Sequence, residues 1–157
     1  MSKFNNIVPV PLGEIRCLDG KLGTAMKPGT LVTAVSNFAG GNSKHTQSDY
    51  PNSVFTAAVA GATSGLLIVM DQEDLVLADI ATARAANSHA RAHVLKSGEE
   101  VTVILTAAAN INAGDGLETV DGGLVQKKAS ATAVFSAIES ATTASSGDGL
   151  RILARVL

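Results

Sequence analysis

Short apolar runs separated by turn residues recur along most of this chain. Aliphatic and β-branched residues dominate the runs, which is typical of β-strands. Asp121-Gly122-Gly123 between two apolar runs is a strong hairpin signal, because Asp and Gly tolerate the backbone conformations that tight turns require. The pattern predicts about eight short strands, drawn from the segments 30–35, 54–59, 66–70, 89–95, 100–107, 117–120, 124–127, 134–140 and 150–157.

Two of these segments show the two-residue period of a strand with distinct faces. Val101, Val103 and Leu105 share one face of the first. Ile152 and Ala154 share a face of the last, together with Leu150 and Val156. We therefore predict an all-β fold, a small antiparallel β-barrel or a β-sandwich. Strand patterning does not distinguish the two, because both produce short alternating strands.

Two stretches do not follow this pattern. The segment 79–93 is rich in Ala and Arg, which favour helix, but large apolar residues at helical spacing are missing and Asn87-Ser88 interrupts it. Helix and strand both remain open there. The segment 36–53 has the composition of a loop and is long for a connection within a compact domain, which is typical of functional or disordered loops.

The first twenty residues form a predicted extended arm, and 21–157 a β-rich domain. Each proline of the arm fixes φ, removes a backbone donor and biases the preceding residue toward extended geometry. The apolar side chains of such an arm need a surface to cover, either the protein's own core or a neighbouring subunit. The candidate interface residues are Phe4, Ile7, Val8, Pro9, Val10, Pro11 and Leu12.

Composition narrows the classes of function. The 157 residues are 46% hydrophobic, with no Trp, one Tyr and four Phe, so we expect a core of small side chains that depends on association for part of its stability. The net charge of −2 argues against a protein held to nucleic acid by phosphate neutralisation and against a polybasic membrane anchor. No apolar stretch approaches the length of a membrane span, and no secretory segment is evident. We expect a soluble protein made in a cytoplasm.

Candidate chemistry is sparse. On a strand, His89 and His93 would lie about 13 Å apart, too far to share a metal ion, and we expect both at the surface. His45 and Asp49 lack a third ligand nearby in sequence, and Asp71, Glu73 and Asp74 are typical of a solvated turn. The single cysteine, Cys17, excludes an internal disulfide and has no local activating setting.

A repeated tetrapeptide is also best explained as turn structure. Gly114-Asp115-Gly116-Leu117 and Gly147-Asp148-Gly149-Leu150 are each followed by a strand-like run and lack the lysine of a phosphate-binding loop. No Gly-x-Ser-x-Gly nucleophile elbow exists. We predict no enzymatic activity, no metal and no cofactor.

Several short motifs, taken in order, resemble the capsid decoration (cement) proteins of tailed bacteriophages. Pro28-Gly29-Thr30-Leu31-Val32 is similar to an early strand of that family. The segment 96–105, the run 109–117 containing Asn110-Ile111 and Gly114-Asp115, and the hairpin 121–125 resemble its central part. The segments 133–139 and 150–156 resemble the end of that family's sequence. The resemblance covers residues 28–35 and 94–157, and its strength lies in the order of the motifs.

The resemblance implies a β-rich structural protein of the virion, made in the host cytoplasm and bound to the capsid exterior. It implies major capsid proteins as partners, bridged by a decoration protein that is a homo-trimer, without nucleic acid or membrane. A decoration protein gains affinity from many modest contacts repeated over a lattice.

Two other classes remain open. A β-sandwich module that binds carbohydrate or another surface would use aromatic platforms, and Tyr50 in the long loop is the best candidate for one. A small hydrolase or lyase would need a cleft that holds His89 or His93 beside a carboxylate.

Overall fold

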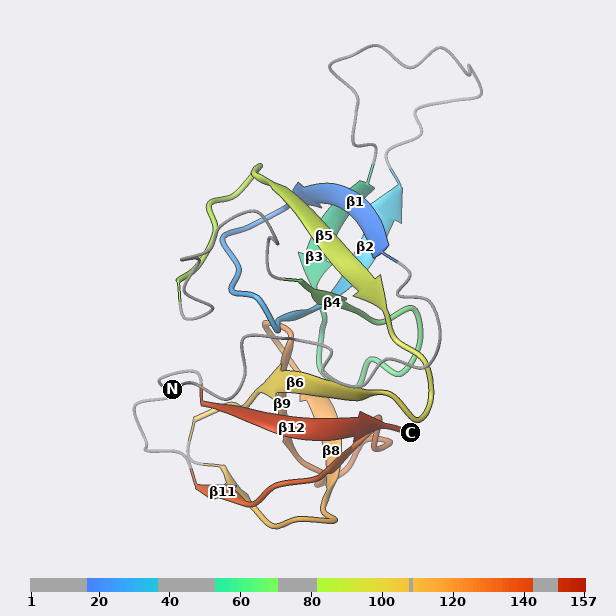
Figure 1. Cartoon of the computed structure of the whole chain (residues 1–157), viewed down its shortest axis with the longest axis vertical. Helices are drawn as coiled ribbons and strands as arrows, with labels where there is room; N and C mark the ends of the chain where they lie inside the picture. The colour runs from blue at the N-terminus through green and yellow to red at the C-terminus, as the bar shows by residue number, and fades with distance from the viewer. Residues whose placement is uncertain (1–16, 37–52, 71–81, 108, 143–149) are drawn as a thin grey trace.

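The computed structural model describes residues 17–36, 53–70, 82–107, 109–142 and 150–157, and these residues form two stacked lobes of β-structure (Figure 1). The first lobe contains the strands β1 to β5 and the second contains β6 to β12. The strands are β1 (Cys17–Leu22), β2 (Leu31–Ser36), β3 (Ser53–Ala57), β4 (Leu67–Val69), β5 (His89–Val94), β6 (Glu100–Ile104), β7 (Asn110–Ile111), β8 (Gly116–Val120), β9 (Leu124–Lys127), β10 (Phe135–Ala137), β11 (Ala141–Thr142) and β12 (Arg151–Val156).

The first lobe is a closed five-stranded barrel with the strand order β1-β3-β2-β4-β5. β1 closes it by pairing antiparallel with β5, from Cys17 opposite His93 to Lys21 opposite His89. On its other edge β1 runs parallel to β3, with Leu22 opposite Phe55. Closure of the barrel therefore depends on a strand from the start of the described chain.

The barrel interior is filled by small and medium apolar side chains around one aromatic ring. Phe55 on β3 is fully buried, and its ring lies against Gly20 of β1, where an added Cβ would come within 2.6 Å of it. Ala90 and Ala92 alternate inward on β5, as a strand with one buried face requires. The barrel core consists of Leu22, Met26, Val32, Phe55, Leu67, Val69, Ala90 and Ala92.

The second lobe is a five-stranded antiparallel sheet with the order β6-β12-β10-β8-β9, beside a small β7–β11 pair. Its two edges approach each other, because Leu105, just after β6, forms a parallel bridge with Val125 of β9. The long register between β6 and β12 runs from Ile104 opposite Arg151 to Glu100 opposite Arg155. The sheet thus curls around its own core.

The core of the second lobe extends into the first. Phe135, Val101, Val103 and Leu117 are fully buried members of this core. Leu31, Ala58 and Ile68, which belong to the first lobe, are buried in the same cluster. The two lobes therefore share one apolar core at their junction.

The all-β prediction is confirmed, and every predicted strand segment contains a strand. The alternation predicted for segments 100–107 and 150–157 is also correct, since Val101, Val103, Leu105, Ile152 and Ala154 are all buried. The strands β1, β7 and β11 were not predicted. Between 82 and 93 the chain forms no helix, and β5 occupies its end.

The predicted arm and the predicted long loop lie largely outside the described residues. β1 begins at Cys17, so residues 17–20 of the predicted arm are part of a barrel strand, while 1–16 lie outside the described residues. The predicted loop is bounded by β2 and β3, and its residues 37–52 also lie outside. Among the described residues, no helix has the length and apolarity needed to cross a membrane.

Candidate partner-binding surface at the lobe junction

Main-chain hydrogen bonds join the two lobes at the β8–β9 hairpin. Leu31 N donates to Gly123 O at 2.9 Å, and Gly123 N donates to Ala58 O at 3.0 Å. Ala60 N donates to the Asp121 carboxylate at 2.9 Å. The predicted Asp-Gly-Gly turn therefore also attaches the second lobe to the barrel.

Gly123 is required at this contact. Its φ is +71°, and an added Cβ would lie 2.1 Å from the carbonyl oxygen of Leu31. The neighbouring Gly122 has a φ of +83° but has no atom within 4 Å of the corresponding position. Positive φ alone therefore explains Gly122, whereas Gly123 also permits the close approach of the lobes.

A fully buried histidine–glutamate pair connects the end of β5 to the turn before β6. His93 Nε2 lies 2.8 Å from Glu99 Oε2, and both side chains have no exposed surface. The same carboxylate oxygen accepts a hydrogen bond from Lys96 N at 3.0 Å. Glu99 also holds the second lobe through its main-chain oxygen, which accepts from Val156 N at 2.8 Å. The pair therefore fixes the linker between the lobes.

The position of His93 corrects the expectation that both histidines lie at the surface. His89, on the same strand face, is exposed beside Asp19, with 3.7 Å between His89 Nε2 and the carboxylate. His93 is covered because the 96–99 turn folds over that end of the strand. Its Nδ1 atom has no hydrogen-bond partner among the described residues. The two histidines share no site.

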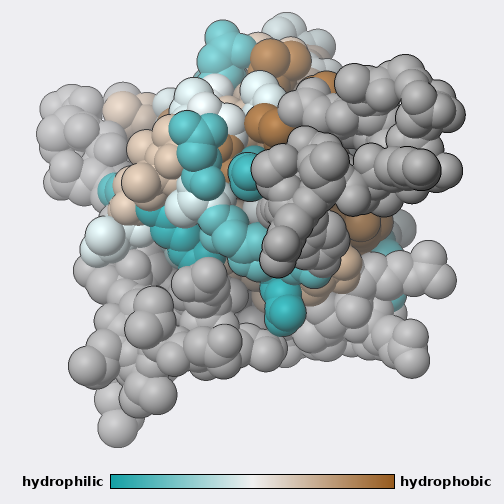
Figure 2. Space-filling view, turned by 90° about the horizontal axis from the view of Figure 1, so that it is seen from above, coloured by the Kyte–Doolittle hydropathy of each residue, from teal (hydrophilic) through white to brown (hydrophobic). Residues whose placement is uncertain are grey.

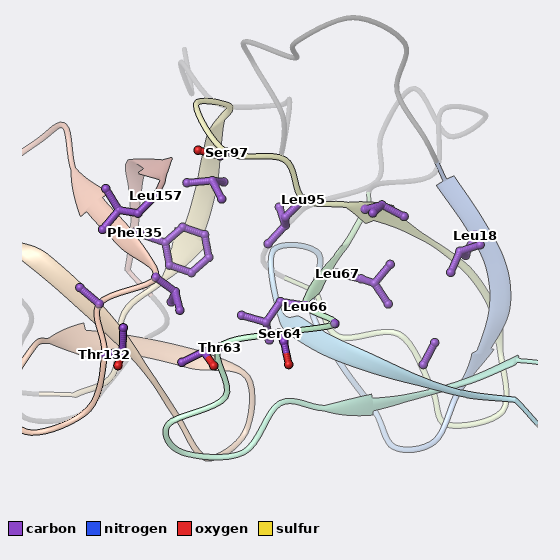
Figure 3. A pocket seen from close by; sticks show the side chains of 16 residues that line it. Leu18, Thr63, Ser64, Leu66, Leu67, Leu95, Ser97, Thr132, Phe135 and Leu157 are labelled. Carbon is purple, nitrogen blue, oxygen red and sulfur yellow. The ribbon is translucent and has the colours of Figure 1, made fainter.

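An open apolar groove of about 550 Å³ runs along one side of the junction (Figure 3). Leu18 of β1 lies at one end, Phe135 and Leu157 lie at the other, and Leu66 lies between them. None of the lining side chains carries a charge. We call this the interlobe groove and define it by its apolar walls, Leu18, Leu66, Leu95, Val134, Val156 and Leu157.

A second groove of about 530 Å³ also has walls from both lobes. Met26 and Ala57 come from the barrel, and Ile104 and Leu124 come from the second lobe. Unlike the interlobe groove it includes a charged residue, Lys27. Seen from the barrel end of the molecule, hydrophilic and hydrophobic residues are mixed on the described surface (Figure 2). The two grooves are candidate binding surfaces.

The remaining sequence candidates do not assemble into a reactive site. The predicted turn at Gly114-Asp115 is present and leads into β8 at Gly116, and the Asp115 carboxylate accepts from Asn112 N at 2.8 Å. The hydrogen bond from Lys127 and that from Asn112 N lower the pKa of Asp115. The side chain of Cys17 is exposed at the start of β1. The described part of the chain contains no cluster of three or more His, Cys, Asp or Glu side chains that could hold a metal ion.

Several candidates fall outside the described residues. They are the arm residues Phe4, Ile7, Val8, Pro9, Val10, Pro11 and Leu12, the loop residues His45, Asp49 and Tyr50, the acidic residues Asp71, Glu73 and Asp74, and the second Gly-Asp-Gly copy at 147–149. Sequence reasoning missed the interlobe groove altogether, because its walls come from five separated stretches of the chain. The apolar residues Leu66, Leu95 and Leu157 at strand ends were the available signal.

Comparison with solved structures identifies the fold. The chain is similar to the crystal structure of the head fiber gp8.5 N base of bacteriophage phi29, with a TM-score of 0.56 and 12% sequence identity. The similarity covers 92% of this chain and 95% of the chain in that structure. This chain and the phi29 N base therefore share a fold. No protein-family model matches the chain, and no curated protein sequence matches it.

Proposed function

We propose that this chain is a structural virion protein of a tailed bacteriophage that binds the outer surface of the capsid. The observation that carries the proposal is the shared fold with the phi29 head fiber base, which extends over 92% of this chain. The ordered motifs between residues 94 and 157 support it independently, because they resemble the capsid decoration family. A shared barrel alone would fit many functions.

In this role the protein bridges neighbouring major capsid proteins as a homo-trimer on the capsid exterior. We propose a binding role, and no catalytic one, for the described residues. Their buried titratable pair, His93 and Glu99, joins two parts of the fold and does not line the interlobe groove. Weak contacts repeated on a symmetric shell give strong attachment through multivalency. Attachment also stabilises a small-residue core by mass action.

Quantitative mass spectrometry of purified virus particles from the source tests this function. We expect a copy number comparable with that of the major coat protein. A protein absent from particles, or present at a few copies, would contradict decoration of the lattice. Light scattering of the purified protein tests the trimer separately, since a trimer has three times the 15.9 kDa mass of the chain.

A capsid-binding assay sharpens the test. Capsids that lack the protein are mixed with purified protein, pelleted and then challenged by heat. We expect saturable binding and a higher temperature of capsid disruption, because a bridging protein must be removed before neighbouring coat subunits separate. Binding without a change in capsid stability would support surface attachment and contradict bridging.

A further inference from the structure

We propose that the interlobe groove is the binding site for the apolar segment 7–12 of the same chain, which would lie across both lobes as a strap. This inference is independent of the proposed virion function. It begins from the groove itself. Leu18 and Leu157 at its two ends are 41% and 60% exposed, although both are large aliphatic side chains. Such exposed apolar surface commonly marks a binding site.

The segment before residue 17 joins β1 beside this groove. β1 starts at Cys17, directly before the groove residue Leu18, and Cys17 pairs with His93 beside the linker between the lobes. The four residues 13–16 can span about 13 Å, and the segment 7–12 can span about 20 Å when extended. The segment is thus tethered close enough to enter the groove of its own chain, where its effective concentration is high.

The chemistry of the segment matches the groove. Ile7-Val8-Pro9-Val10-Pro11-Leu12 carries no charge, and the lining side chains of the groove carry none. Each proline biases the residue before it toward extended geometry, and in a strand-like segment residues 8, 10 and 12 would share one side. Pro9 and Pro11 lack an N–H group, so the segment needs fewer main-chain partners than an ordinary strand.

Disulfide capture in the full chain tests the proposal. Because the sequence contains one cysteine, the background variant is Cys17→Ser, and the reporter pair is Val8→Cys with Leu157→Cys. We expect oxidation to give an intrachain disulfide at monomer mass on a non-reducing gel, at a yield independent of protein concentration. The matched control is Val8→Cys with Val59→Cys, since Val59 is 64% exposed and does not line the groove. Cross-linking of the control at equal yield would overturn the proposal.

A fluorescent reporter provides a second measurement. The chain has no tryptophan, so Val8→Trp introduces a single emitter. We expect emission at shorter wavelength than in denaturant, and a shift back toward the solvent-exposed value when Leu157→Glu or Leu18→Glu is added. The control Val59→Glu should leave the emission unchanged. Solvent-like emission of Val8→Trp in the folded protein would overturn the proposal.

The oligomeric state of the cross-linked product separates the strap from the alternative occupant. A disulfide-linked dimer whose yield rises with concentration would show the arm on a second copy, which would overturn the intrachain strap and support the neighbouring-subunit contact predicted for residues 4–12. Failure of the strap leaves the virion function intact, because particle composition tests that function separately.

Discussion

The two lobes are held in shape by different interactions. In the second lobe, carboxylates accept hydrogen bonds from main-chain N–H groups. The clearest case is the buried Glu118, whose Oε2 accepts from Ala131 N at 2.7 Å and from Ser130 N at 3.2 Å. Glu139 accepts from Leu153 N at 3.1 Å. In the described part of the first lobe, the Asp19 carboxylate instead lies beside the exposed side chains of His89 and Arg91. Both lobes depend on strand pairing between distant parts of the chain. Hydrogen bonds from main-chain N–H groups to carboxylates are the additional feature of the second lobe.

The junction between the lobes combines both kinds of interaction. Leu31 and Ile68 of the barrel are buried in the apolar core of the second lobe. The carboxylates of Asp121 and Glu99 accept main-chain hydrogen bonds at the same boundary. We therefore expect both lobes to unfold in one cooperative transition.

The largest expected effect is the loss of the buried pair. His93→Ala leaves the Glu99 carboxylate without its side-chain partner and enclosed by protein, which should lower the free energy of unfolding by about 3–5 kcal/mol. Urea denaturation followed by circular dichroism measures this loss. Because the pair fixes the linker, we also expect the single transition to separate into two.

The double variant His93→Leu/Glu99→Leu tests whether the loss of stability in His93→Ala comes from leaving the Glu99 carboxylate without its histidine. Replacing both partners by apolar groups avoids a buried carboxylate that has lost its histidine, so it should cost less than His93→Ala. A double variant that is less stable than the single variant would show that the turn at 96–99 depends on the carboxylate itself.

A smaller effect is expected from crowding at the hairpin contact. Gly123→Ala would place a methyl group 2.1 Å from Leu31 O and would retain a φ of +71°. Overpacking and the positive φ together should lower the free energy of unfolding by about 2–4 kcal/mol. Gly122→Ala shares the positive φ without the contact and should lose about 1–2 kcal/mol. Equal losses in the two variants would show that the lobes can separate locally without cost.

Acid should weaken the second lobe through Glu118. The hydrogen bond from Gln126 and those from main-chain N–H groups lower the pKa of Glu118 below its usual 4.5. The unfolded chain then binds a proton more readily than the folded one, so stability is complete above about pH 4.5 and is lost as the pH falls through the lowered pKa. Glu118→Gln should be less stable near neutral pH and should show a shallower loss of stability in acid.

The variant Gln126→Leu is the matched comparison for this pH dependence. It removes the side-chain donor and leaves the main-chain donors in place, so its acid sensitivity should lie between those of the wild type and Glu118→Gln. Thermal unfolding at a series of pH values measures all three. Identical pH profiles for wild type and Glu118→Gln would contradict a stabilising role of the carboxylate.

Local signals allowed the strands of the five-stranded sheet, and β2 to β5 of the barrel, to be predicted from the sequence. The alternation of Val101, Val103 and Leu105 and the turn at Asp121 depend on neighbours along the chain. Closure of the barrel could not be predicted in this way. In β1, the stretch Cys17-Leu18-Asp19-Gly20-Lys21 has no apolar alternation, and its partners β3 and β5 lie far along the chain. It therefore had the pattern of an arm.

The buried pair shows why the candidate site was also beyond sequence reasoning. On β5, Ala90 and Ala92 face the barrel core, and His93 lies on the opposite, outer face. The 96–99 turn covers that face, and its path depends on the position of the second lobe. The interlobe groove depends on the same placement, so neither feature has a periodic signature in the chain.

The smallest expected effect concerns the surface ion pairs, and it tests the comparison between the lobes directly. Arg155 in the second lobe contacts Glu100 at 2.9 Å, and Arg91 in the first contacts Asp19 at 3.1 Å. The two arginine side chains are similarly exposed, at 57% and 56%. Arg155→Ala and Arg91→Ala should each lower the free energy of unfolding by at most about 1 kcal/mol, and by less at high salt. A much larger loss for Arg155→Ala would show that surface ion pairs, rather than carboxylates bound to main-chain N–H groups, distinguish the second lobe from the barrel.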